Sequence, residues 1–320
     1  MNSTNFTFLA RRILGSVPLL IGISIILFGV LNLAPGGPTD VYAEIPGVSA
    51  ETLENLKREL GLDQPVPVQY VRWLGAAVRG EWGYSIRTGR RVATDVKERI
   101  PATLLLGGTA FLLALLGAIP LGIMSAVRRY STVDYVFTFL SFVGFSMPIF
   151  WLALMLQSLF AVQWHLLPSA GMVSIGDGSF VDRVRHIILP ASILALAYMA
   201  SWGRFTRASM LDVLGLDYIR TAKAKGLGNG TVIYRHALRN ALVPVLTVIA
   251  LDFAGMISGA IITETIFAWP GMGRLFIESM NGRDYPVLMA LLMIGSLALV
   301  GMNLLTDIIY SFVDPRIRYE

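Results

Sequence analysis

The chain has 320 residues, of which 55% are hydrophobic and only 15% are charged, and its mean hydropathy is +0.64. A soluble protein of this size is usually about 25% charged. The composition therefore excludes an ordinary soluble enzyme, as well as disordered, collagen-like and disulfide-stapled chains. The net charge is +5, and the absence of cysteine excludes thiol nucleophiles, iron–sulfur clusters, thiolate zinc sites and disulfide switches.

Six apolar blocks follow one another along the chain. Each is close to the roughly 20 residues that a helix needs to cross about 30 Å of hydrocarbon. The sequence therefore predicts an all-α integral membrane protein with six transmembrane helices. The third block is long enough to tilt, or to break near Met147 and Pro148. The blocks cover about residues 13–33, 102–127, 133–162, 187–205, 243–267 and 287–310.

The basic residues indicate the orientation of these spans. Six spans place both termini on one side of the membrane, and cytoplasmic loops carry an excess of lysine and arginine. If the termini are cytoplasmic, the inner segments hold 13 of the 26 basic residues and only 5 acids, whereas the outer segments hold 13 of each. We therefore expect cytoplasmic N and C termini. The pair Arg11 and Arg12 then anchors the first span, whose apolar run of about 21 residues is too long for a cleavable signal.

Two domains are predicted. Residues 1–101 hold the first span and an external helical region, and residues 102–320 hold a core of five helices. In the external region, leucines at helical spacing between Ser49 and Gly61 predict one helix, and residues 69–78 predict a second. The region is either a structural cap on the membrane surface or a landing surface for an extracytoplasmic partner, and both interpretations remain open.

A basic loop over residues 208–242 is the most informative segment between spans. Apolar residues at intervals of three and four predict one helix from Leu211 to Ala222, which Gly226 ends. A second helix follows, with Val232 and Ala237 on one side. Two short helices joined at a glycine turn form a protruding knob. From physics alone, a basic juxtamembrane loop held by anionic lipid fits this pattern equally well.

Seven motifs in order carry a family resemblance. Residues 217–227 (DYIRTAKAKGL), continued by 235–244 (RHALRNALVP), closely resemble the coupling loop of the inner-membrane permeases of dipeptide and oligopeptide ABC importers. The other six motifs resemble the first of that system's two permeases. They are LAPG at 33–36, LGLDQP at 60–65, QYVRWL at 69–74, GYS at 83–85, RIPATL at 99–104 and ETIFAWPGMGR at 264–274.

The loop departs from the general importer pattern in two ways. Arg220, Thr221 and Ala222 replace its opening Glu-Ala-Ala, and Gly226 precedes Pro244 by 18 residues rather than 13. The longer form is similar to that of the peptide branch, which tolerates it, so the departure argues against sugar and amino-acid importers. The resemblance does not identify the solute, because related permeases carry nickel, glutathione or oligosaccharides.

The resemblance implies a type I ABC importer permease fold with cytoplasmic coupling helices, in the plasma membrane of a bacterium or archaeon. It also implies a second homologous permease, two P-loop ATPase subunits and an extracytoplasmic solute-binding protein as partners. ATP and Mg would bind only to the ATPases, since residues 226–230 lack the lysine of a phosphate loop. We expect this chain to bind no cofactor and to have no catalytic residue. The implied ATPase-coupling residues are Arg220, Thr221, Ala222, Lys223, Ala224, Lys225, Gly226, Leu227, Arg235, His236, Arg239 and Asn240.

Two acids in the spans are candidates for the translocation pathway, Asp252 and Glu264. An ionised carboxylate within a membrane is costly and usually faces the bundle interior, a partner or a water-filled path. Asp252 either lines the pathway, where it would meet a peptide amino group or a basic residue, or forms a structural pair. Glu264 lies closer to a span end, where an interfacial or paired role is expected.

Two other classes of function remain open alternatives. A stand-alone secondary transporter or channel would use Asp252 as an ion or proton site, but the sequence shows no inverted repeat. A membrane scaffold would need neither Asp252 nor an ATPase. No metal site is expected, because the three histidines lie in different segments. Nucleic acid is not an expected partner either, because the basic residues are not interleaved with aromatic ones.

Overall fold

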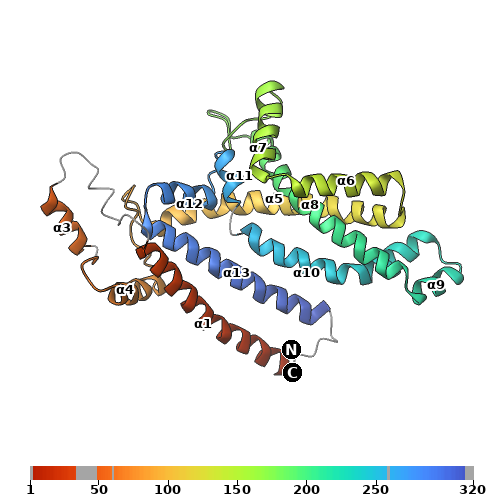
Figure 1. Cartoon of the computed structure of the whole chain (residues 1–320), viewed down its shortest axis with the longest axis horizontal. Helices are drawn as coiled ribbons and strands as arrows, with labels where there is room; N and C mark the ends of the chain where they lie inside the picture. Colours follow the sequence, from red (N-terminus) through yellow and green to blue (C-terminus); the bar gives the residue numbers. More distant parts are fainter. Residues whose placement is uncertain (1–2, 34–48, 60, 258–259, 314–320) are drawn as a thin grey trace. The chain divides into compact units, whose positions relative to one another are not determined.

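The computed structural model describes residues 3–33, 49–59, 61–257 and 260–313, and this part of the chain is helical apart from loops and one isolated antiparallel bridge (Figure 1). Five helical stretches are long and apolar enough to cross a membrane, and a bent pair of helices makes a sixth if the pair counts as one span. The prediction of an all-α membrane protein is confirmed, with five to six candidate spans. The five continuous candidate spans are Arg11–Leu33, Val92–Val127, Phe180–Leu214, Thr231–Phe253 and Tyr285–Leu305.

Two of the predicted blocks are interrupted. The third forms α6 (Thr132–Ser146) and α7 (Ile149–Gln157), continued by a π-helical turn, η1 (Ser158–Gln163), and the chain bends by 102° between α6 and α7, at the predicted break. The fifth block was wrong as a single helix. It forms α10 (Leu238–Ile257) and the short α11 (Ile261–Ile266). The prediction failed because apolar composition does not distinguish one long helix from two consecutive ones.

The helices of the other four blocks are longer than those blocks predicted. Polar turns extend the membrane-crossing helices, because a helix continues into the interface wherever its backbone groups stay paired. The two helices predicted between the first and second spans are confirmed as α3 and α4. The helices outside the two interrupted blocks are α1 (Ser3–Leu33), α3 (Ala50–Glu59), α4 (Val66–Val78), α5 (Val92–Val127), α8 (Phe180–Leu214), α9 (Asp217–Ala224), α12 (Met272–Asn281) and α13 (Tyr285–Val313).

The chain folds as two compact units. The first comprises Met1–Thr103 and Pro270–Val300, and the second comprises Leu104–Trp269 and Gly301–Glu320. The helix α5 begins in the first unit and ends in the second. The predicted division into domains 1–101 and 102–320 stays a prediction.

In the first unit, aromatic side chains hold α4 against α1. The ring of Phe28 packs against Tyr70 and Trp73, with centroids 5.5 and 5.8 Å apart, and the hydroxyls of Ser24 and Tyr70 are hydrogen-bonded at 2.8 Å. Ser24 is completely buried by this contact. A second apolar cluster joins the start of α5 to α12 and α13. It consists of Val92, Val96, Met272, Leu275, Val287, Ala290 and Leu291.

In the second unit, α8 packs against both α6 and α10 (Figure 1). It also approaches α5 so closely that a Cβ atom added to Gly122 would lie 2.7 Å from the carbonyl oxygen of Gly203 and 2.6 Å from the Cβ of Thr206. No side chain fits at residue 122 without displacing α8. Small residues at helix contacts are typical of membrane proteins, because close packing replaces the hydrophobic effect there.

Candidate functional site

The 208–242 loop is built from α9 and a π-helical turn, η2 (Thr231–Ala237), which continues directly into α10. The predicted single helix from Leu211 to Ala222 is wrong. The helix α8 ends at Leu214 with Gly215 at its C-cap, and α9 begins at Asp217. The apolar spacing continues across this break, so it did not reveal that the helix ends. Gly226 has a φ of +77°, which agrees with the predicted glycine turn after α9.

An apolar cluster attaches this loop to the second unit. Ile219 and Ala222 of α9 are buried, and so is Val232 of η2. They pack with residues from the ends of α5 and α8 and from the beginning of α10, so the loop continues the hydrophobic core and is not a loose connection. The complete cluster is Ile123, Ala126, Met210, Ile219, Ala222, Val232, Ala237 and Ala241.

One of the predicted coupling residues faces inward, although the coupling role of the whole set stays a prediction. The side chain of Ala222 is only 7% exposed and points into the chain's own cluster, so we leave it out of the proposed docking surface. Asn240 also has a structural contact, because its side-chain amide donates a hydrogen bond of 2.7 Å to the hydroxyl of Tyr218. His236 is half-buried. The other predicted residues are exposed: Arg220, Thr221, Lys223, Ala224, Lys225, Gly226, Leu227, Arg235, Arg239 and Asn240.

Five of these exposed side chains are basic, and they give the loop a positive outer face. Within the part of the chain that the structure describes, one of them forms an ion pair: Arg220 contacts Asp217 at 3.3 Å, and both side chains are more than 70% exposed. Such a pair is weak in water, so it leaves Arg220 able to exchange partners. The loop therefore combines an apolar inner face with a basic outer face that attracts acidic or carbonyl groups.

A buried carboxylate that the sequence did not point to lies beside the attachment of this loop. Asp134 accepts two hydrogen bonds from the guanidinium of Arg207, at 2.6 and 2.9 Å. It also accepts bonds from the hydroxyl of Ser125, at 2.5 Å, and the backbone N–H of Tyr130, at 2.9 Å. Asp134 thereby links the ends of α5, α6 and α8. The sequence signal at this position, Ser131 followed three residues later by an acid, indicates only a helix cap.

Asp252 is half-buried in α10, and its carboxylate is oriented by α8. The indole N–H of Trp202 donates a hydrogen bond of 2.6 Å to one carboxylate oxygen. The rings of Tyr198 and Phe111 pack on Trp202 at 5.4 and 5.5 Å between centroids, which fixes the direction of that N–H. Within the described residues Asp252 has no basic partner. A carboxylate with a fixed direction can bind a cationic group.

Glu264, the second pathway candidate, lies in a different environment. It belongs to the short α11, and its side chain has no exposed surface. Its backbone carbonyl accepts a hydrogen bond of 2.8 Å from the N–H of Trp269, which closes the turn after α11. The side chain of Asp252 is partly exposed, whereas that of Glu264 is fully buried, so Asp252 is the accessible candidate.

Comparison with known families agrees with this architecture. The family described as "Binding-protein-dependent transport system inner membrane component" matches residues 118–319, and the N-terminal part of such components matches residues 5–107. The chain belongs to this family. It is therefore a multi-pass inner-membrane component of a transport system and not an enzyme, and the matches give no support to the alternative of a stand-alone carrier.

Individual relatives cover almost the whole chain. The oligopeptide transport system permease protein AppB of Bacillus subtilis is 44% identical over 98% of this chain and 99% of its own length. The dipeptide transport system permease protein DppB of Escherichia coli is 41% identical over the same shares. Among solved structures, an inward-facing form of the MetNI methionine ABC transporter matches 69% of this chain and 96% of its own, with a TM-score of 0.56 and 14% identity. This structural match confirms the type I importer permease fold.

Proposed function

We propose that this chain is one of two permease subunits of an ATP-driven importer, and that it forms half of the translocation pathway for peptides or related small solutes. The full-length identity to permeases of oligopeptide and dipeptide transport systems supports the solute class. The partners are a second homologous permease, two P-loop ATPase subunits and an extracytoplasmic solute-binding protein. ATP and Mg bind to the ATPase subunits, and this chain holds no cofactor.

One observation carries the coupling role, namely that the 208–242 loop is firmly attached on one face and basic on the other. The exposed residues of α9 and η2 dock in a groove of an ATPase subunit. When ATP closes the ATPase dimer, the docked loop moves with it. Because Ile219 and Val232 are buried against the ends of α5 and α8, that movement passes to the spans as a rigid-body change between inward-facing and outward-facing states.

The charge distribution supports an orientation with both termini in the cytoplasm. In that orientation the 208–242 loop faces the ATPases, and the segment between α1 and α5 faces the solute-binding protein. The helix α5 crosses the membrane once, so its N-terminal and C-terminal ends lie on opposite sides. The lipid bilayer surrounds the apolar outer faces of the spans.

Within the pathway, Asp252 is the group that meets the solute. Its hydrogen bond to Trp202 fixes one carboxylate oxygen, and its partial exposure leaves the carboxylate accessible. The amino group of a peptide is a cation of the right size to bind a single carboxylate in a medium of low dielectric constant. Glu264 remains a pathway candidate only for a state in which α11 moves, because its side chain is fully buried in this structure.

Affinity purification tests the proposal. The tagged chain is extracted from its native membrane in mild detergent, and the proteins recovered in near-equal amounts are identified by mass spectrometry. We expect a second permease and one or two P-loop ATPases. Recovery of the chain alone, under conditions in which a known importer complex stays intact, would contradict the proposal and favour a carrier that works by itself.

A further inference from the structure

A short hairpin precedes α5 in the first unit, and its backbone is closed at several points. Tyr84 and Arg91 form an antiparallel bridge, and the N–H of Ser85 donates a 2.8 Å hydrogen bond to the carbonyl of Arg90. Gly83 and Gly89 have φ angles of +81° and +67°, a region that glycine adopts without strain. The 84–91 hairpin is therefore a defined turn.

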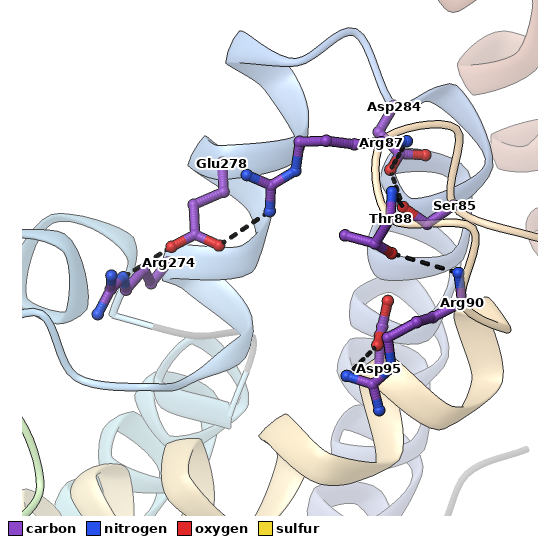
Figure 2. Close-up of polar contacts among 8 residues, drawn as sticks. All are labelled: Ser85, Arg87, Thr88, Arg90, Asp95, Arg274, Glu278 and Asp284. Atoms are coloured by element: carbon purple, nitrogen blue, oxygen red, sulfur yellow. Dashed lines mark hydrogen bonds and ion pairs between the residues drawn. The ribbon is translucent and has the colours of Figure 1, made fainter.

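A buried carboxylate from a distant part of the chain fixes this hairpin in place. Asp284, which is 1% exposed, accepts a hydrogen bond from the hydroxyl of Ser85 at 2.5 Å (Figure 2). It also accepts hydrogen bonds from the backbone N–H groups of Ile86 and Arg87, at 3.1 and 3.4 Å. Ser85 also accepts a bond of 3.0 Å from the N–H of Thr88. Burying a carboxylate costs free energy unless several donors surround it. Here three donors from the turn offset that cost, so the buried carboxylate holds the exposed turn in place.

The charged side chains of the hairpin are also held in position. Figure 2 shows Arg87 extending to Glu278, at 3.4 Å, and Glu278 in turn accepting from Arg274, at 2.8 Å. Arg90 pairs with Asp95 at 2.9 Å and with Glu98, a contact that the figure does not draw, at 2.8 Å. The hydrogen bond with Glu98, together with the charge of Asp95, raises the pKa of Arg90 above its ordinary value. These pairs therefore hold both guanidinium groups in fixed directions.

Three other side chains near these pairs are exposed. The ring of Tyr84 is 59% exposed. The side chains of Arg91 and Lys97 are exposed and have no ion-pair partner among the described residues. Tyrosine and arginine are the residue types that most often anchor protein interfaces, because they bring a large contact area and strong hydrogen bonds at little conformational cost. A rigid turn carrying both is already ordered for binding.

We propose that the 84–91 hairpin, with Lys97 on the following turn of α5, is the surface on which an acidic face of the solute-binding protein docks. The inference rests on the proposed function, because that function places this end of α5 outside the cytoplasm and supplies the partner. Tyr84 and Arg91 make the contacts, and Asp284 positions them by holding the backbone of the turn. Arg87 and Arg90 direct their charge toward the partner and set its register.

The charge pattern favours a protein over a lipid surface. Glu98 is exposed and Glu278 is half-buried between the arginines, with side chains 54% and 26% accessible. An anionic membrane attracts segments in which basic charge is unopposed, and exposed carboxylates weaken that attraction. A protein partner, in contrast, can match alternating charges and gains specificity from them.

The test uses the complete importer, reconstituted in lipid nanodiscs with its second permease and ATPases. The concentration of solute-loaded binding protein that gives half-maximal stimulation of ATP hydrolysis is measured for wild type, Tyr84→Ser and Arg91→Glu. We expect each substitution to raise that concentration about tenfold. The increase for Arg91→Glu should shrink as the salt concentration rises, since exposed charges are screened over about 8 Å at physiological ionic strength.

Lys57→Glu provides the matched control, because it makes the same change of sign on an exposed residue of α3. We expect it to leave the half-maximal concentration unchanged. Equal effects of Lys57→Glu and Arg91→Glu, or no effect of either hairpin variant, would overturn the proposal. The proposal would also be overturned if the half-maximal concentration depended on the fraction of anionic lipid in the nanodisc and not on the hairpin substitutions. If wild type itself is not stimulated by any binding protein, the proposed function fails instead.

Discussion

The molecule holds its two prominent exposed turns in different ways. The 208–242 loop is attached by apolar side chains, of which Ile219 and Val232 are nearly or completely buried. The 84–91 hairpin is attached by polar contacts: the carboxylate of Asp284 accepts three hydrogen bonds, and Arg87 pairs with Glu278. Close apolar packing transmits the displacement of one element to its neighbours, whereas directional hydrogen bonds fix a backbone in one place. The first arrangement suits a part that moves with its partner, and the second suits a part that must be ready when a partner arrives.

Three substitutions test this difference and a fourth tests the pathway, and they are ordered by their expected effect on the stability of the fold. Asp134→Asn should have the largest effect. It leaves the guanidinium of Arg207 without a counter-charge although that side chain is only 26% exposed, so we expect the free energy of unfolding to fall by about 3 kcal/mol. The measurement is unfolding in detergent, followed by circular dichroism.

Asp217→Asn is the control for Asp134→Asn, since it removes the acid of an exposed pair in the same loop. We expect no measurable change in its unfolding. Unfolding of Asp134→Asn at the wild-type midpoint would show that the buried pair does not support the attachment of the 208–242 loop.

Ser85→Ala should have the next largest effect. It removes one of the three donors to Asp284, which stays buried, and we expect a loss of about 1–2 kcal/mol. Hydrogen exchange should accelerate at the amides of Ile86 and Arg87, which donate to the same carboxylate. Thr88→Ala is the matched control, because its exposed hydroxyl accepts only a long bond of 3.4 Å from Arg90. Equal exchange in both variants would contradict the role of Asp284.

Gly226→Asp should cost about 1 kcal/mol of stability, because φ is +77° and aspartate adopts this region with only moderate strain. No atom lies within 4 Å of an added Cβ, so the importer should still assemble. We expect transport to fall at least tenfold, to about a tenth or less of wild type, while ATP hydrolysis continues, because the altered turn no longer passes movement to the spans. Uptake and hydrolysis are measured together in proteoliposomes.

Gly228→Asp introduces the same charge two residues further on, at an exposed glycine that has space for a side chain and no positive φ. We expect Gly228→Asp to keep a higher ratio of solute uptake to ATP hydrolysis than Gly226→Asp. Normal uptake by Gly226→Asp would show that this turn does not transmit movement to the spans.

Asp252→Asn should affect stability least, because the amide oxygen of asparagine still accepts the hydrogen bond from Trp202. Its effect should appear in transport. We expect uptake of peptides with a free amino group to fall about tenfold, with little change for peptides whose amino group is acetylated, as measured at saturating binding protein. An equal rate for wild type and Asp252→Asn with both kinds of peptide would exclude Asp252 from the pathway.

The sequence predicted the features that depend on nearby residues. Apolar blocks located the spans, and spacing of three and four placed Ala222 and Val232 on helices with an apolar face. The break at Gly215 was missed because apolar spacing continues through it. The bonds of Asp134 to Arg207 and of Asp284 to Ser85 were missed because they join residues 73 and 199 positions apart. A single sequence contains no local signal for such pairs, since only the fold brings them together.

Solute uptake into proteoliposomes tests the central claim most directly, that this chain is a permease driven by separate ATPases. The chain is reconstituted with its second permease and the ATPases, and uptake of labelled peptide is measured with and without ATP and the loaded binding protein. We predict uptake only when both are present. Uptake by this chain alone, driven by a proton or sodium gradient and abolished in Asp252→Asn, would contradict the claim and identify a secondary transporter.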